Sequence, residues 1–417
     1  MTTRTLGQRA SFWVSAGVVS HTLWTSAAPA MVYPVYAAEW HLTHTVTTAI
    51  FAIYPIVVVS VLVAFGDVSD TIGRRATMLL GLTASLLGVL LFAVASNVIW
   101  LFVGRALMGV GVGLSAGPST AAVLEFSAAG QSKRASSITT AAQAVGFTLA
   151  LLIGGGLVEY APLPTYLSFW LLFIVLATLF AATWFLPGRT VEPQSSRWRF
   201  RMPSIPLGFR KTFAISSMAV TTAYVHGVMI LSLGAQVAHD LVGSANALTN
   251  GAALSLFPIS FGVVGILAKS LPSRVAMTLG ALDSAVGMGL LVVSVAQHQL
   301  LIFLTSTAIS GMGYSLLFLG GLAEINAKAP APQRGGILSA LYLFAYLALG
   351  TVAMILGVVA TKWGLGLAIK LGAGAIALLS GVTMVLSAPG SLKASTARGD
   401  EVSAECNPES PQPSVCL

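Results

Sequence analysis

Four ionisable side chains lie inside long apolar stretches, where they could do chemistry. His21 and His226 occupy the first and seventh stretches, Arg105 the fourth and Asp283 the ninth. A histidine titrates near neutral pH and could carry a proton, whereas an arginine could hold an anionic group or take part in proton coupling. Ionisable groups in such surroundings usually mark a functional site. Each also has a structural alternative: hydrogen bonds within the bundle for the histidines and Asp283, and bonds to helix carbonyls for Arg105.

Aromatic residues accompany these groups. Trp24 follows His21 by three residues, Tyr54 lies in the second stretch, and Tyr342 and Tyr346 are four residues apart in the eleventh. Residues four apart share one face of a helix. Rings that converge on a cavity would suit an aromatic or amphipathic ligand, although any single ring is more often part of the packing.

Helices that cross a membrane must position these residues. The 417 residues are 56% hydrophobic and only 8% charged, against about 25% charged in a soluble domain. Apolar runs of about 20 residues recur, each long enough to cross about 30 Å of hydrocarbon as a helix. Runs such as LLGVLLFAVA do not alternate as barrel strands would, so we predict an all-α membrane protein. The predicted spans are 12–36, 45–66, 75–96, 98–123, 135–158, 166–187, 212–238, 245–268, 274–296, 299–323, 336–361 and 364–388.

Lysine and arginine are unevenly distributed between the predicted loops. Alternate loops and the two ends of the chain hold 18 of the 21, as cytoplasmic segments do. We therefore predict a multi-pass protein of the cell (inner) membrane with both termini cytoplasmic. The net charge of +8 comes from these segments and does not indicate nucleic-acid binding. Cys406 and Cys416 are expected to be reduced thiols, and we predict neither a metal site nor a cofactor.

A basic, proline-containing linker divides the chain into two halves. An offset of 199 residues aligns them as a weak repeat, which pairs Arg75 with Arg274 and Glu125 with Glu324. Internal repeats of this kind are typical of transporters. The predicted units are an N-terminal six-helix bundle (1–187), a cytoplasmic linker (188–211), a C-terminal six-helix bundle (212–388) and a disordered cytoplasmic tail (389–417).

The loop GDVSDTIGRR between the second and third spans has a distinctive spacing of glycines and charges. Its elements are Gly66, Asp70, Gly73, Arg74 and Arg75. The pattern resembles the signature of the major facilitator superfamily, and RALMGVGVG in the fourth span is similar to a second motif of that family. The resemblance covers residues 10 to 390. It implies twelve transmembrane helices in two pseudo-symmetric six-helix bundles, whereas the loop taken alone could be a plain basic loop.

The same resemblance implies a conformational latch, a set of contacts that stabilises one state of the transporter. Asp70 would lie against the start of the eleventh span, and Arg74 would bridge it to Glu125 at the end of the fourth. In the second half, Lys269 stands where the acid should be. We therefore expect a one-sided latch, of which the second half keeps only the turn and Arg274.

The fifth span, VGFTLALLIGGG, partly matches the antiporter signature of the drug-efflux branch, with Ala150 and Leu151 in place of its Gly-Pro step. The resemblance favours a secondary active transporter, not an enzyme, that exports drug-like or amphipathic small molecules by proton-coupled alternating access. Its partners would be the substrate, protons and the lipid bilayer, and we expect a monomer. One alternative is an importer or exporter of a small organic anion or metabolite with Arg105 as its ligand. Another is a membrane receptor that transports nothing.

Overall fold

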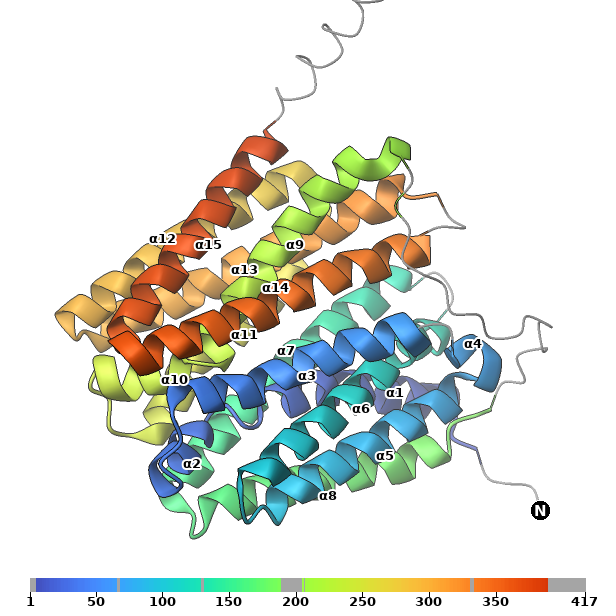
Figure 1. Cartoon of the computed structure of the whole chain (residues 1–417). Helices are drawn as coiled ribbons and strands as arrows, with labels where there is room; N and C mark the ends of the chain where they lie inside the picture. The colour runs from blue at the N-terminus through green and yellow to red at the C-terminus, as the bar shows by residue number, and fades with distance from the viewer. Residues whose placement is uncertain are drawn as a thin grey trace, which may run out of the picture.

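The computed structural model describes residues 5–65, 68–128, 131–188, 205, 207–330 and 334–388, and these form helices with no strand among them. The all-α prediction is thus confirmed. The long helices run side by side (Figure 1). They are α1 (Gln8–Ala27), α3 (His44–Phe65), α5 (Arg74–Ala93), α6 (Val98–Glu125), α7 (Ser132–Tyr160), α8 (Pro164–Trp184), α9 (Arg210–Leu231), α11 (Ala247–Leu267), α12 (Ser273–Gln297), α13 (Leu300–Lys328), α14 (Arg334–Trp363) and α15 (Leu365–Ser387).

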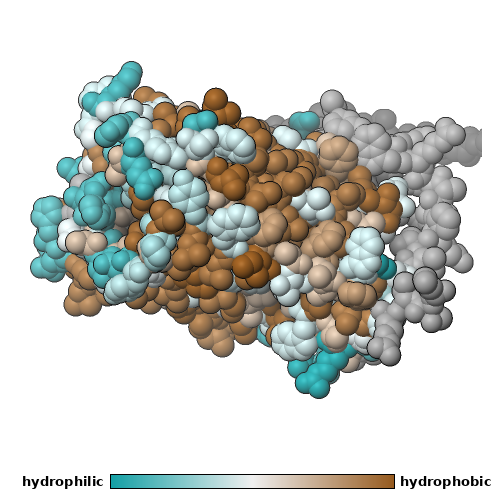
Figure 2. All heavy atoms as spheres, turned by 90° about the horizontal axis from the view of Figure 1, so that it is seen from below, coloured by the Kyte–Doolittle hydropathy of each residue, from teal (hydrophilic) through white to brown (hydrophobic). Residues whose placement is uncertain are grey.

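Eleven of these helices are long and apolar enough to cross a membrane. The remaining one, α1, has the length of a span but is less apolar, because it buries several serines and threonines besides His21. Figure 2 shows a largely hydrophobic surface over the middle of the molecule and a more hydrophilic region at one end. Large apolar side chains such as Leu301 and Leu378 are exposed, as expected where helices face lipid.

Two predicted spans end earlier than the sequence suggested. In place of a span over 12–36, α1 ends at Ala27 and a turn leads to the short helix α2 (Tyr33–Glu39). Pro29 and Pro34 explain the break, because proline lacks the N–H that a continuing helix needs.

The span predicted at 212–238 is interrupted in a similar way. Helix α9 ends at Leu231 and is followed by α10 (Gly234–Gln236) and a π-helical turn (Val237–Leu241). We call the end of the molecule that bears α2 and α10 the α2 end. The opposite end, which bears α4 (Val68–Ile72), is the α4 end (Figure 1).

Equivalent helix pairs of the two halves pack in the same way. A Cβ added to Gly81 of α5 would lie 2.7 Å from the carbonyl oxygen of Gly111 in α6. A Cβ on Gly280 of α12, 199 residues later, would lie 2.9 Å from the carbonyl oxygen of Gly313 in α13. Small residues allow such close contact between membrane helices. The sequence repeat therefore corresponds to a repeated packing arrangement.

The halves meet where α3 packs on α14 and where α7 packs on α11. At the α2 end, the Thr45 hydroxyl donates to the Gly357 carbonyl oxygen at 3.2 Å, and the Thr45 N–H donates to the Thr361 hydroxyl at 2.8 Å. At this same end, Glu159 Oε2 accepts a hydrogen bond of 2.7 Å from the Ala247 N–H. These contacts hold the two halves together at the α2 end.

Candidate functional site

Arg105 lies two turns into α6 and is completely buried, with 0% of its surface exposed. Its Nη1 donates to the Thr25 carbonyl oxygen at 3.1 Å, and its Nη2 donates to the Ser26 carbonyl oxygen at 2.8 Å. Both carbonyls belong to the last turn of α1, where helix geometry leaves them without an intrahelical partner. Arg105 therefore caps α1 and places its positive charge at the negative end of that helix.

The other neighbours of Arg105 come from α3 and from α2. The guanidinium carbon lies 4.4 Å from the centroid of the Tyr54 ring and 5.9 Å from that of Phe51. Arg105 Nε and the Tyr33 hydroxyl are buried, and neither has a hydrogen bond of standard geometry to a described residue. The two side chains lie close enough to interact with each other. Buried polar atoms normally have partners, so Arg105 and Tyr33 together form a polar centre inside the first half.

Four half-buried tyrosines of the second half form what we call the tyrosine cluster: Tyr224 of α9, Tyr314 of α13, and Tyr342 and Tyr346 of α14. Tyr224 is central. Its ring centroid lies 4.8 Å from that of Tyr346, edge to face, and 6.5 Å and 6.4 Å from those of Tyr314 and Tyr342. The cluster presents both aromatic faces and hydroxyl groups.

The tyrosine cluster reaches the first half through Tyr346, which lies close enough to Tyr54 for their side chains to interact electrostatically. Three of these residues, Tyr54, Tyr342 and Tyr346, are among the predicted site residues. Tyr224 and Tyr314 were missed. A tyrosine in the middle of an apolar span is the signal that could have found them, since its hydroxyl is costly to bury in lipid.

Both predicted histidines are buried. His21 Nδ1 lies 2.5 Å from the Val18 carbonyl oxygen, and its Nε2 lies 3.4 Å from the Ser85 hydroxyl on α5. His226 Nδ1 lies 3.3 Å from the Ser284 hydroxyl on α12. Ser85 and Ser284 are 199 residues apart, so each histidine meets the same position of the repeat.

The other two predicted intramembrane residues lie apart from these contacts. Trp24 is half-buried and packs against the hydrophobic core. Asp283 is half-buried on α12, directly before Ser284. Among the described residues, no group of three or more His, Cys, Asp or Glu side chains could hold a metal ion.

The predicted latch is described in part. Gly66 and the side chain of Asp70 lie outside the described residues. Gly73 has a φ of 88° directly before α5, a conformation that a residue with a Cβ rarely adopts. Arg74 forms an ion pair with Glu125 at the end of α6. The Arg75 guanidinium stacks on the Trp184 ring at 5.9 Å, so both arginines make contacts inside the first half.

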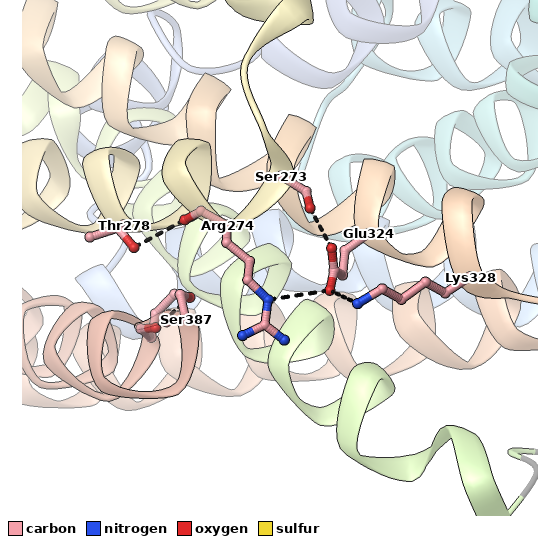
Figure 3. A network of polar contacts seen from close by, with 7 residues as sticks. Ser273, Arg274, Thr278, Glu324, Lys328 and Ser387 are labelled. Atoms are coloured by element: carbon pink, nitrogen blue, oxygen red, sulfur yellow. Dashed lines mark hydrogen bonds and ion pairs between the residues drawn. The ribbon is translucent and has the colours of Figure 1, made fainter. Parts of the chain in front are cut away.

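The second half has a polar network of its own, which corrects the expectation that it keeps only the turn and Arg274. Ser273 donates a hydrogen bond to Glu324. Lys328 Nζ lies 2.6 Å and Arg274 Nε lies 3.6 Å from the same carboxylate (Figure 3). Ser273 and Glu324 are the repeat partners of Arg74 and Glu125. In the sequence, Lys269 replaces the acid of the first half. The sequence did not indicate that Glu324 would accept contacts from Ser273, Arg274 and Lys328.

Replacing Glu324 with glutamine should lower the free energy of unfolding by about 1–3 kcal/mol, because it removes charge-assisted hydrogen bonds from a side chain that is only 5% exposed. The matched change, Glu125→Gln, should cost less, under about 1 kcal/mol, because the Arg74 side chain is 40% exposed and solvent screens the pair. Thermal unfolding of the purified variants in detergent measures both. A larger loss for Glu125→Gln would contradict this ranking.

The fold and its buried polar centre define a multi-pass membrane protein of the transporter class. The chain belongs to the Major Facilitator Superfamily, whose sequence model matches residues 13–349.

Individual relatives are distant. The sugar transporter ERD6-like 6 of Arabidopsis thaliana is 26% identical over 140 residues, which cover 34% of this chain and 26% of that protein. A mutant of the nucleoside transporter NupG has a TM-score of 0.75 at 12% identity, over 91% of this chain and all of that chain. A mutant of the peptide transporter POT in complex with sulfate has a TM-score of 0.73 at 15% identity, over 92% of this chain and 94% of that chain. These structural similarities concern the fold.

Proposed function

We propose that this secondary transporter is a proton-coupled exporter of drug-like or amphipathic small molecules. The tyrosine cluster supports this proposal most directly. Its four rings come from three helices and remain half-buried, and one of them, Tyr346, interacts electrostatically with Tyr54 of the other half. Flat aromatic faces with hydroxyl groups at their edges suit a ligand that has both apolar and polar parts.

His21 and His226 are the proposed proton carriers, with Asp283 as a third candidate. A carbonyl oxygen can only accept, so Nδ1 of His21 carries the hydrogen that bonds to Val18, and Nε2 is the acceptor facing Ser85. Protonation at Nε2 would turn this acceptor into a donor. The Ser85 hydroxyl would then have to turn, which would couple the proton to the contact between α1 and α5.

Transport would proceed by rocking of the two halves about the tyrosine cluster and Arg105. The contacts of Thr45 and Glu159 would hold the α2 end closed in one state. In the other state, the latch of Gly66, Asp70, Gly73, Arg74, Arg75 and Glu125 would stabilise the closed α4 end. We further propose a monomer in the cell (inner) membrane with both termini cytoplasmic.

A second candidate function is transport of a small organic anion or metabolite with Arg105 as the substrate ligand. The buried polar centre of Arg105 and Tyr33 favours it. The compared transporters are named for nucleosides, peptides and sugars, which are polar metabolites.

Replacing Tyr346 with alanine should weaken ligand binding by about tenfold or more, because a buried aromatic contact is lost. The test is a thermal-shift screen of amphipathic compounds at two pH values, since a bound ligand raises the apparent stability. Transport of each hit is then measured in proteoliposomes with an imposed pH gradient.

The matched control is Phe344→Ala on the same helix, because Phe344 is 54% exposed. It should bind ligand like the unmodified protein. Equal losses of ligand binding in both variants would contradict the proposed exporter. Transport that does not depend on the pH gradient would also contradict it.

A further inference from the structure

A pocket of about 440 Å³ lies at the α4 end of the first half, away from the tyrosine cluster. Its walls come from the start of α1, the residues that follow α6 and the start of α7. The volume is in the range of small-molecule sites, about 300–1,000 Å³. Neither the latch nor the proposed substrate site uses this pocket.

The pocket carries positive charge without an acidic residue in its lining. Arg9 and Arg134 line it, both side chains are exposed, and neither forms an ion pair among the described residues. Arg134 Nη1 is oriented by a hydrogen bond of 3.2 Å to Gln131 Oε1. Glu125, the acid closest to the pocket along the chain, is already bound to Arg74. Two guanidinium groups in one pocket match the geometry of a phosphate group.

The helices that contribute these arginines add to the positive potential. Arg9 lies in the first turn of α1 and Arg134 lies in the first turn of α7, and neither first turn contains an acidic residue. The N-terminus of a helix carries a partial positive charge, which is uncompensated here at both helices. An anion in the pocket would therefore be attracted by the arginines first and by both helix ends in addition.

The remaining walls are aromatic and lie at the level where the membrane begins. Phe12, Trp13 and Phe126 line the pocket, and the rings of Phe12 and Trp13 meet edge to face at 5.3 Å. Trp13 is 53% exposed, and α7 is long and apolar enough to cross a membrane. Tryptophan is typical of the boundary between hydrocarbon and headgroups. A ligand there can place a charged group on the arginines and an acyl chain on the rings.

We propose that this pocket binds the headgroup phosphate of an anionic phospholipid, with its glycerol and acyl chains against Trp13 and Phe126. Charge complementarity selects an anionic lipid over a zwitterionic one, and the aromatic walls select a lipid over a free phosphate ion. Bound lipid would join α1 to α7, because each helix contributes one of the two arginines. The lipid would thereby stabilise the first half.

The first test compares ligands on the delipidated full-length protein in neutral detergent. Dioleoylphosphatidylglycerol should raise the temperature of thermal unfolding, whereas equal amounts of dioleoylphosphatidylcholine or inorganic phosphate should raise it much less. If inorganic phosphate stabilised as well as the anionic lipid, the pocket would be a site for free anions. A shift of equal size with phosphatidylcholine would show that headgroup charge plays no part; either result overturns the proposal.

The second test compares variants. The double variant Arg9→Gln, Arg134→Gln should need about tenfold or more phosphatidylglycerol for half of its shift, which corresponds to one lost charge-assisted hydrogen bond. The control is Arg210→Gln, Lys211→Gln, which removes the same charge from exposed residues at the start of α9. It should respond like the unmodified protein, and an equal loss in the control would show diffuse attraction instead of a site.

If the double variant does not fold, the single variants Arg9→Gln and Arg134→Gln replace it. Native mass spectrometry then counts the phosphatidylglycerol molecules that each retains. Fewer retained molecules than in the unmodified protein support the pocket, and unchanged counts in both variants contradict it.

Discussion

Replacing Arg105 with leucine is expected to lower the free energy of unfolding by about 2–5 kcal/mol, because it leaves two buried carbonyl groups without donors. These are the Thr25 and Ser26 carbonyls at the end of α1. Arg105→Lys should be intermediate, since an ammonium group retains the charge but lacks the planar fork that reaches both oxygens. Thermal and chemical unfolding in detergent measure the differences.

The matched control is Lys362→Leu, which removes an exposed positive charge at the α2 end. Its effect should stay within about 0.5 kcal/mol, as for most surface substitutions. A leucine variant at Arg105 that is as stable as this control would show that the two carbonyl contacts contribute little.

Arg105→Gln separates the two candidate functions. Glutamine can still donate to one of the two carbonyls, so this variant should fold well enough for transport measurements. If it loses the binding of organic anions and keeps its response to a pH gradient, Arg105 is a substrate ligand. If it loses proton coupling, the exporter proposal is favoured. If the variant keeps both anion binding and proton coupling, Arg105 only stabilises the first half.

Replacing Gly357 with valine is expected to shift the protein toward states in which the α2 end is open. A Cβ on Gly357 of α14 would lie 1.7 Å from the Thr48 hydroxyl and 3.1 Å from the His44 carbonyl oxygen of α3. These helices must therefore move apart. Overpacking of this kind costs about 1–3 kcal/mol, which corresponds to a change of about 5-fold to 150-fold in the population ratio. Transport should fall strongly, because alternating access requires the α2 end to close.

The distance between spin labels on α3 and α14 at the α2 end measures this shift. Cys406 and Cys416 are first replaced by serine so that labels attach only at introduced cysteines. Gly374→Val on α15 is the control, because a Cβ there meets nothing within 4 Å. The control should keep the distances of the unmodified protein. Unchanged distances in Gly357→Val would show that close packing of α3 on α14 does not keep the α2 end closed.

The sequence by itself determined the helical membrane architecture. A helix satisfies its own backbone hydrogen bonds, so an apolar run of sufficient length specifies a span without reference to other parts of the chain. The loop from Gly66 to Arg75 indicated the family for a related reason. Its motif is a contiguous segment, so it can be recognised without knowing what the loop contacts. The 199-residue repeat was also visible in the sequence, and it pairs Gly81 with Gly280, two glycines that lie at equivalent close helix contacts.

Only the tertiary structure decided what these residues contact. Arg105 bonds to backbone carbonyls 80 and 79 residues away, and a carbonyl group has no signature in a sequence. Tyr224 and Tyr314 join Tyr342 and Tyr346 because three helices converge, and helix spacing relates residues of one helix only. Glu324 accepts a hydrogen bond from Ser273. Arg74 stands at the position of the first half that is equivalent to Ser273, so the residue types did not predict this contact. The sequence thus specified the helices and their family, whereas packing between helices specified the partners, because those contacts depend on separations and rotations that no local pattern records.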